Sequence, residues 1–213
     1  MSTHDPTLTR SEARLWKLIE ERTRAETDTE AIDRRIWDLF GEDWSIMMTD
    51  LTGFSRHVAK FGIIHFLQVI HEHKKLLLPI VERHDGVLVK VEADSLLVLF
   101  KRPDSALECA IAMQHACQNA NLRRIAEERM LLCIGLGVGR VLRAGESDVF
   151  GAEVNAASKL GEDTARSDEI LVTHAFQEAI AGRTDVSVEP IDVEIPGTDR
   201  AFRVVYTKAD GRV

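Results

Sequence analysis

The chain has 213 residues and a formal net charge of −8, from 27 Lys and Arg against 35 Asp and Glu. This length allows one domain with an extension and a sizeable core, and charges spread without a long basic stretch argue against nucleic acid as a partner. No apolar run approaches the roughly 18 residues of a membrane-spanning helix, and the first residues lack a signal-peptide pattern. We therefore expect a cytoplasmic protein without a membrane partner, whose cysteines are reduced and buried because they show no CxxC spacing.

The first part of the chain has the pattern of two helices. Apolar residues recur at helical spacing between about residues 9 and 40, and a polar stretch at 23–29 interrupts them. We expect residues 1–43 to form a helical extension that serves dimerisation or regulation, or that simply packs on the main domain at 44–213.

From Trp44 onward, β-favouring runs alternate with helical patterns. The runs predict strands at 44–49, 86–91, 95–100, 130–138, 169–173, 186–195 and 201–207, with a return partner beginning at 141–143. The helical patterns predict helices at 53–60, 63–82, 104–121, 149–160 and 175–180, with Asp104 as a cap. Short turns between neighbouring strands favour antiparallel pairing, so we predict an α+β fold: an antiparallel-rich sheet with helices covering one face, plus the N-terminal helical extension.

Two aspartates are the most informative residues. Asp50 lies in MMTDLTGFS (47–55) and Asp94 in VKVEADSLLVLF (89–100), each where a β-favouring run meets a turn. Aspartate alone often just starts a turn. Two such carboxylates side by side form a hard oxygen site for Mg²⁺, the ion that accompanies nucleoside triphosphates.

A third segment, SDVFGAEVNAASK (147–159), joins these two. The three motifs, in this order, resemble the catalytic domain of class III nucleotidyl cyclases, the adenylate and guanylate cyclase family, from about Trp44 to Thr173. The resemblance implies a ferredoxin-like or palm-type core. It also implies conversion of a nucleoside triphosphate to a 3′,5′-cyclic monophosphate and pyrophosphate.

The resemblance assigns the metal and phosphate positions first. Asp50 and Asp94, with the backbone carbonyl of Leu51, match the ligands of two Mg²⁺ or Mn²⁺ ions. The turn at the following helix start matches the phosphate cradle, which comprises Thr52, Gly53, Phe54 and Ser55. Exposed N–H groups and the helix dipole independently favour phosphate at such a place.

The remaining positions concern the base, the ribose and the transition state. Lys90 and Asp148 match the residues that read the base, in an adenylate-type pair of donor and acceptor. Asn155 matches the residue that orients the ribose, and Lys159 stands where the family usually has a transition-state arginine. Glu92 leaves an alternative open, because a shift of two residues would make it a guanylate-type base reader without changing the side-chain face.

The resemblance also implies a homodimer that builds two sites across its interface, and a nearly inactive monomer. ATP is the favoured substrate; GTP and a pyrimidine triphosphate remain alternatives. A catalytically weak or silent nucleotide-binding module is the other interpretation. A diguanylate cyclase is a weaker option, because this sequence has no Gly-Gly-Asp/Glu-Glu-Phe hairpin. A regulatory partner is possible through the N-terminal helices.

Two departures from the family pattern bear on activity. Lys159 keeps the positive charge of arginine but loses its planar fork. Ala93 replaces the usual glycine before Asp94, and costs about 1 kcal/mol or more if positive φ is required there.

Two further patterns are given structural interpretations. His71 and His73 face different directions on their predicted helix, so we expect a solvated helix surface and not a metal site. Gly135, Gly137 and Gly139 alternate along a strand, which favours close backbone packing.

Overall fold

The computed structural model describes residues 9–52, 62–146 and 148–211. Its helices are α1 (Arg10–Arg22), α2 (Thr29–Phe40), α4 (Ile63–Arg83), α5 (Pro103–Asn121), α6 (Ala152–Ser158) and α7 (His174–Ala179), with a 3₁₀ turn at Ala126–Glu128 and a π-helical turn at Lys159–Thr164. Its strands are β1 (Gly41–Leu51), β2 (Val87–Glu92), β3 (Ser95–Phe100), β4 (Leu132–Arg143), β5 (Val149–Phe150), β6 (Ile170–Thr173), β7 (Ser187–Ile191) and β8 (Ala201–Val205).

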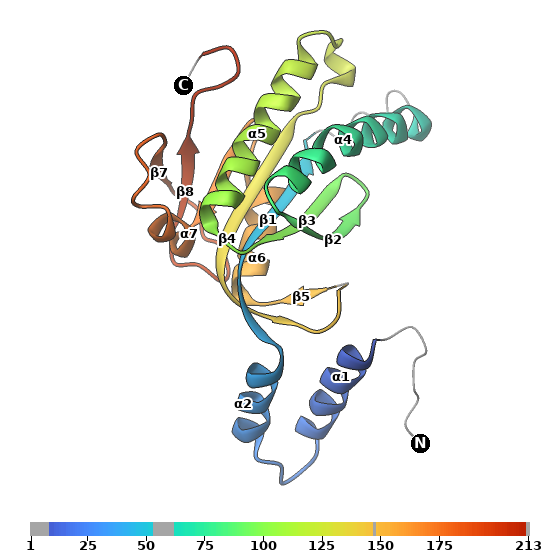
Figure 1. Cartoon of the computed structure of the whole chain (residues 1–213), viewed down its shortest axis with the longest axis vertical. Coiled ribbons are helices and arrows are strands. Elements are labelled where there is room, and N and C mark those ends of the chain that lie inside the picture. Colours follow the sequence, from blue (N-terminus) through green and yellow to red (C-terminus); the bar gives the residue numbers. More distant parts are fainter. Residues whose placement is uncertain (1–8, 53–61, 147, 212–213) are drawn as a thin grey trace.

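These strands form one open sheet in the order β2-β3-β1-β4-β6-β8-β7, and β5 pairs with β4 (Figure 1). The long antiparallel pair of β1 and β4 runs through its centre. Of the pairings, only that of β4 with β6 is parallel among the described residues. The predicted antiparallel-rich α+β fold is therefore confirmed, and the last two strands, β7 and β8, form an antiparallel pair.

Helices cover both faces of this sheet. Leu96, Val98 and Phe100 of β3 pack in the main core with α4 and α5, whereas Leu97 and Leu99 pack in a second core with α6. The prediction that one face is covered is thus wrong. The unbroken apolar run of β3 is typical of a strand that is buried on both faces.

Several element boundaries differ from the prediction, and those of β4, β5 and α5 are the most informative. β4 is one continuous strand from Leu132 to Arg143, and its return partner is β5 at Val149–Phe150, which was predicted to begin a helix. Helix α5 begins with Pro103 at its first position after Arg102, so Asp104 lies in the first turn instead of capping it. Proline suits this position because the first N–H of a helix has no intrahelical partner.

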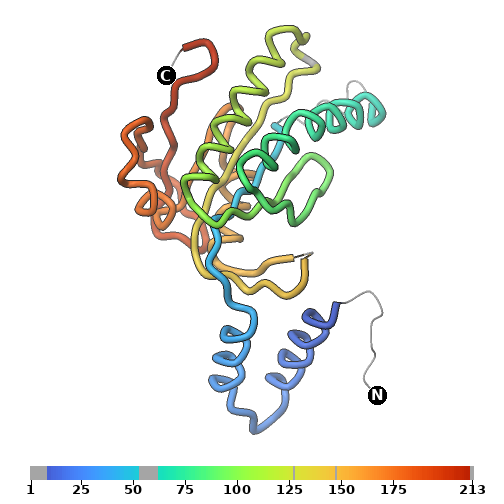
Figure 2. The backbone as a smooth tube through the Cα atoms, in the orientation of Figure 1, coloured from blue at the N-terminus to red at the C-terminus, as the bar shows by residue number. Residues whose placement is uncertain are grey.

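The N-terminal helices α1 and α2 form a pair that projects beyond one end of the sheet (Figure 2). They share a small core of buried residues, namely Leu15, Leu18, Ile32, Ile36, Phe40 and Ala144. Helix α2 passes directly into β1 at Gly41, so the pair is joined without a linker to the central strand. Its role in dimerisation or regulation stays a prediction.

Helix α4 carries the largest departure from the predicted surface. Its buried side includes Phe66, Ile70 and Leu77, as its apolar spacing predicts, but also His73. His73 is fully buried, and neither ring nitrogen has a hydrogen-bond partner within the described part of the chain. The predicted solvated position is therefore wrong for His73, because it lies three residues after Ile70 and four before Leu77 on the same helix face.

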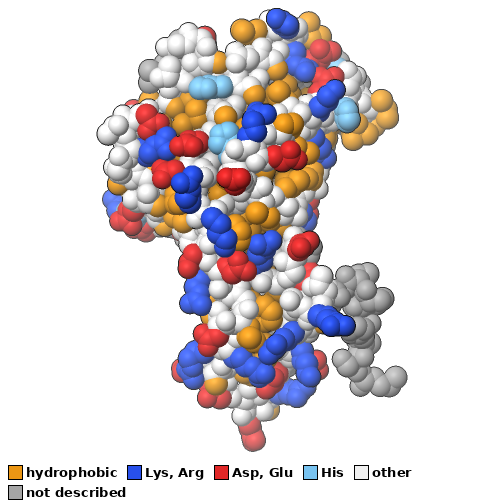
Figure 3. Space-filling model, in the orientation of Figure 1, with side chains coloured by type: hydrophobic (Ala, Val, Ile, Leu, Met, Phe, Trp, Pro, Cys, Tyr) orange, Lys and Arg blue, Asp and Glu red, His pale blue; other side chains and the backbone are white. Residues whose placement is uncertain are grey.

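The surface outside the cores is mixed. Lys and Arg side chains alternate with Asp and Glu over the face seen in Figure 3, both on the main body and on the N-terminal helices. Within the described residues, no helix has both the length and the apolar character to cross a membrane.

Candidate active site

Strand pairing brings the two predicted metal aspartates together. β1 and β3 are in antiparallel register up to Thr49 and Leu96, so Asp50 follows on β1 beside the turn that carries Asp94. The Ser95 hydroxyl donates to Asp50 Oδ1 at 3.2 Å, and the Leu96 N–H donates to Thr49 Oγ1 at 3.2 Å. The sheet therefore holds both carboxylates at one end of two neighbouring strands.

Both carboxyl groups are hard to ionise in this place. Burial, and then the charge of Asp94, raise the pKa of Asp50 to about 6. Burial is also the main cause that raises the pKa of Asp94, which is only 7% exposed. Asp94 Oδ2 is buried without a hydrogen-bond partner in the described structure. A buried carboxylate oxygen with no partner is costly unless a cation compensates it.

This donor set fits a hard divalent cation. Magnesium in proteins is usually held by one or two carboxylates and completes its shell with water and substrate phosphates. Across residues 9–52, 62–146 and 148–211, no group of three or more His, Cys, Asp and Glu side chains is arranged to hold a metal. Asp50 and Asp94 would hold such an ion together with further oxygens, such as the predicted Leu51 carbonyl, water and substrate phosphate.

The turn that joins β2 to β3 and carries Asp94 is strained, as the sequence suggested. Ala93 has φ 48°, in the left-handed region, and it is the first of the two turn residues between Glu92 and Ser95. A two-residue hairpin with positive φ at its first turn residue favours glycine there. Alanine is therefore retained at Ala93 at the expense of backbone strain next to Asp94.

The predicted phosphate cradle is only partly described. The N–H and the hydroxyl of Thr52 both donate to the Leu131 carbonyl, at 2.9 and 3.1 Å. These contacts tie the end of β1 to the residue before β4. Gly53, Phe54 and Ser55 lie outside the described residues, so the phosphate role of this segment stays a prediction.

A cavity of about 210 Å³ collects the predicted base and ribose residues. Lys90 and Glu92 line it from β2, Asp148 lines it from the segment just before β5, and Asn155 lines it from α6. Lys90 Nζ lies 2.6 Å from Glu92 Oε1. This ion pair first, and then the charge of Asp148, raise the pKa of Lys90. The cavity wall thus carries a hydrogen-bond donor, Lys90, close to the acceptors Glu92 and Asp148.

Lys159 lies apart from this cavity. It is exposed at the start of the π-helical turn, where its ammonium contacts Asp163 Oδ2 at 2.7 Å. The sequence predicted an unbroken helix through Leu160, but α6 ends at Ser158 and the wider turn follows. Such π turns are rare and occur frequently at functional sites.

The alternating glycines provide the seat for α6. A Cβ on Gly135 would lie 2.1 Å from the Ala157 carbonyl oxygen, and one on Gly161 would lie 2.6 Å from the Met48 carbonyl oxygen. These close approaches press α6 and the π turn against β4 and β1. The predicted close backbone packing is confirmed for Gly135 and Gly137, whereas Gly139 lies against the side chain of Glu153.

Two residues of the site were not predicted to belong to it. Ser95 bonds Asp50, and a hydroxyl directly after Asp94 in a hairpin was the available signal. Glu162 lines the cavity, accepts a hydrogen bond from Ser158, and adds negative charge near both aspartates. The position of Glu162 depends on the π-helical turn, which the spacing of apolar residues does not predict.

Comparison with known proteins decides the family. The adenylate and guanylate cyclase catalytic domain matches residues 41–205. The chain belongs to this cyclase family. Its match begins at the first residue of β1 and ends at the last residue of β8, so it covers the whole sheet and leaves α1 and α2 outside.

Relatives of this cyclase domain occur within much longer proteins. Over 164 residues it is 28% identical to the serine/threonine-protein kinase pkn2 of Myxococcus xanthus, and over 143 residues it is 32% identical to the putative adenylate cyclase 3 of Rhizobium meliloti. The alignments cover 76% and 67% of this chain but 19% and 24% of those proteins. The chain thus spans about a quarter or less of the curated relatives it matches.

Solved structures agree on the fold. An adenylate/guanylate cyclase/hydrolase from Silicibacter pomeroyi has a TM-score of 0.67 at 22% identity, covering 78% of this chain and 97% of that one. The adenylyl cyclase CyaB from P. aeruginosa has a TM-score of 0.67 at 19% identity, covering 80% and 97%. The cyclase domain described here therefore has the fold of this family throughout its sheet.

Proposed function

We propose that this cyclase domain converts ATP to 3′,5′-cyclic AMP and pyrophosphate at sites shared between two copies of the chain. The observation that carries the proposal is the carboxylate pair of half-buried Asp50 and buried Asp94, with an Asp94 oxygen that lacks a partner in the described structure. Such a pair is costly to the fold and is explained by a divalent cation and its nucleotide.

The cavity residues support an adenine base. Lys90 supplies a donor and Asp148 an acceptor on the same wall, which suits the acceptor nitrogen and the exocyclic amino group on the adenine edge. Glu92 is the competing acceptor, and its 2.6 Å contact with Lys90 occupies the ammonium in the free chain. Adenine binding in this arrangement requires Lys90 to turn from Glu92 toward the base.

The family resemblance and the exposed apolar surface support a composite site. Neither aspartate nor Lys159 is among the residues that line the cavity of Lys90, Asp148 and Asn155, although Ser95, which bonds Asp50, does line it. Large apolar side chains are also exposed on α4 and on the edge strand β2, namely Ile63, Ile64, Leu67, Val87, Leu88 and Val91. Apolar exposure of this kind is typical of surfaces that pair with another chain.

The chain's own groups then have separate tasks. Asp50 and Asp94 hold divalent cations, Mg²⁺ or Mn²⁺, which when bound lower the pKa of the ribose 3′-hydroxyl and neutralise the triphosphate. Asn155 orients the ribose so that the 3′-oxygen faces the α-phosphorus in line with the departing pyrophosphate. Lys159 offers positive charge to the transition state after it leaves Asp163.

The test is turnover of the purified chain with ATP, GTP, CTP and UTP separately, in Mg²⁺ and in Mn²⁺, with products identified by mass spectrometry. Cyclic AMP as the main product, lost in Asp50→Ala and kept in the exposed control Asp38→Asn, would support the proposal. A mixture of Asp50→Ala and Asn155→Ala, each inactive alone, should regain about a quarter of wild-type activity, because half the dimers carry one intact site of two. No recovery in mixed dimers would contradict the shared site.

A catalytically silent nucleotide-binding module is the second candidate, and Lys159 is the observation that favours it. Its ammonium is held by Asp163, and it lacks the fork with which arginine grips two phosphate oxygens. Lys159→Arg should raise kcat of an active enzyme. An inactive chain that binds nucleotide and stays inactive as Lys159→Arg would establish the module instead.

A further inference from the structure

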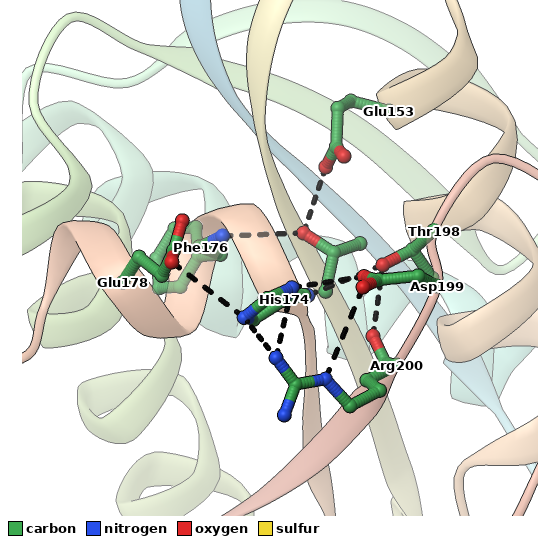
Figure 4. Close-up of polar contacts among 8 residues, drawn as sticks. Glu153, His174, Phe176, Glu178, Thr198, Asp199 and Arg200 are labelled. Atoms are coloured by element: carbon green, nitrogen blue, oxygen red, sulfur yellow. Dashed lines mark hydrogen bonds and ion pairs between the residues drawn. The ribbon is translucent and has the colours of Figure 1, made fainter.

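Glu153 is an inward-facing carboxylate on the helix that carries Asn155. The two residues are two positions apart on α6, so they point about 200° apart around the helix. Asn155 lines the cavity, whereas Glu153 reaches toward the sheet (Figure 4). Burial raises the pKa of Glu153.

The carboxylate of Glu153 joins three elements. Its Oε2 accepts hydrogen bonds from the Val138 N–H of β4 at 3.2 Å and from the Thr173 hydroxyl at the end of β6 at 2.7 Å. Thr173 Oγ1 in turn accepts the Phe176 N–H in the first turn of α7 (Figure 4). Paired residues of β4 and β6 end at Leu136 and Val172, so Glu153 bonds the strands just where their own ladder stops.

The sheet is shaped to receive this side chain. A Cβ on Gly137 would lie 2.8 Å from Glu153 Oε2, and one on Gly139 would lie 2.9 Å from Glu153 Cγ. Two of the three alternating glycines of β4 thus leave room for one glutamate. From the opposite side, Gly197 at φ 99° lies against the Ala152 carbonyl, where a Cβ would come within 2.6 Å.

We infer that Glu153 is a positioning residue: its carboxylate fixes α6 on β4 and β6 and thereby sets where Asn155 meets the nucleotide. The anchoring follows from the contacts of Glu153 alone, whereas its effect on turnover rests on the proposed function. Carboxylate acceptors form stronger hydrogen bonds than neutral ones, and α6 has only seven residues. A short helix of this kind takes its position from such contacts and not from its own stability.

The first experiment compares Glu153→Ala and Glu153→Gln in the full chain. We expect Glu153→Ala to lower kcat by about 10- to 100-fold with KM within about threefold, because misplacement of a reacting group acts on the transition state. The kcat of Glu153→Gln should lie between those of wild type and Glu153→Ala, since the amide oxygen of glutamine can still accept both hydrogen bonds but carries no charge. Glu178→Gln is the matched control: it is an exposed glutamate of α7 whose side chain contacts His174. Its kcat should not change.

The second experiment asks whether Glu153 acts through Asn155. If it does, Glu153→Ala combined with Asn155→Ser, a milder substitution that keeps measurable turnover, loses no more than about threefold beyond Asn155→Ser alone. Losses that multiply across the two substitutions would overturn the inference. The folded state of each variant is checked by urea denaturation, and Glu153→Gln carries the same cycle if Glu153→Ala does not fold.

The third experiment does not depend on turnover. Amide hydrogen exchange in peptides covering 151–160 should become faster in Glu153→Ala, and to a smaller degree in Glu153→Gln, while the β2–β3 hairpin keeps wild-type protection. Unchanged protection of α6 would overturn the anchoring. If the wild-type chain turns over no nucleotide, the proposed function fails, and the exchange result still decides whether Glu153 holds α6.

Discussion

His73 should make the fold sensitive to mild acid. It is fully buried on α4, and both ring nitrogens lack a partner in the described structure. Burial, and then the charge of Lys74, lower the pKa of His73 from 6.5 to about 4. A histidine in this state must stay neutral for the chain to remain folded.

The sign and size follow from proton linkage. Unfolded His73 binds a proton near its ordinary pKa and folded His73 only at lower pH, so its contribution to stability is complete above about pH 6.5. It is lost as pH falls from there to about 4. With pKa values of 6.5 and about 4, the loss between pH 7.5 and pH 5 is about 2 kcal/mol.

The assay is urea denaturation of wild type and His73→Leu at pH 7.5 and pH 5. Leucine has a similar volume and does not titrate, so the variant should lack about 2 kcal/mol of the acid-induced loss. It should also be about 1 kcal/mol more stable at pH 7.5, because two unsatisfied nitrogens are removed. His71→Leu, at an exposed position of the same helix, controls for the replacement of a histidine by leucine outside the core. Equal pH dependence in wild type and His73→Leu would refute the reasoning.

Three substitutions test the strain, charge and packing at the site. Ala93→Gly should raise stability by about 0.5–1 kcal/mol in thermal denaturation, since the relief of left-handed strain exceeds the entropic cost of ordering a glycine. Ala181→Gly, in an exposed turn without positive φ, is the control and should lower stability or leave it unchanged. The raised pKa of Asp50 means that its ionisation costs stability increasingly as pH rises from 3.8 to about 6. After allowance for its partial exposure, Asp50→Asn should stabilise the chain by about 1–2 kcal/mol at pH 8 in EDTA and lose this gain near pH 4; equal melting temperatures at pH 8 would contradict it. Gly135→Ala should cost about 3 kcal/mol or more in urea denaturation, because its Cβ would meet backbone at 2.1 Å; a wild-type midpoint would show that α6 can move away freely.

The placement of Asp50 and Asp94 at strand ends could be predicted from the sequence, because β-favouring runs stop at both residues. It also suggested the strain at Ala93, which depends only on local backbone geometry. His73 and the π turn after Ser158 depend on what packs against them, and periodicity alone does not report that. The continuous β4 was missed because Gly139 suggested a break, whereas it clears space for Glu153.

One hairpin links the two halves of the proposed site. Lys90 lies on β2 at the cavity, and Asp94 lies four residues later in the turn beside Asp50. In a two-fold dimer with composite sites, each hairpin would therefore supply a base-reading residue to one site and a metal ligand to the other. A change in the Ala93 turn would alter both sites together. In the proposed dimer, a small backbone shift at the strained Ala93 would therefore couple nucleotide recognition at one site to metal binding at its twin.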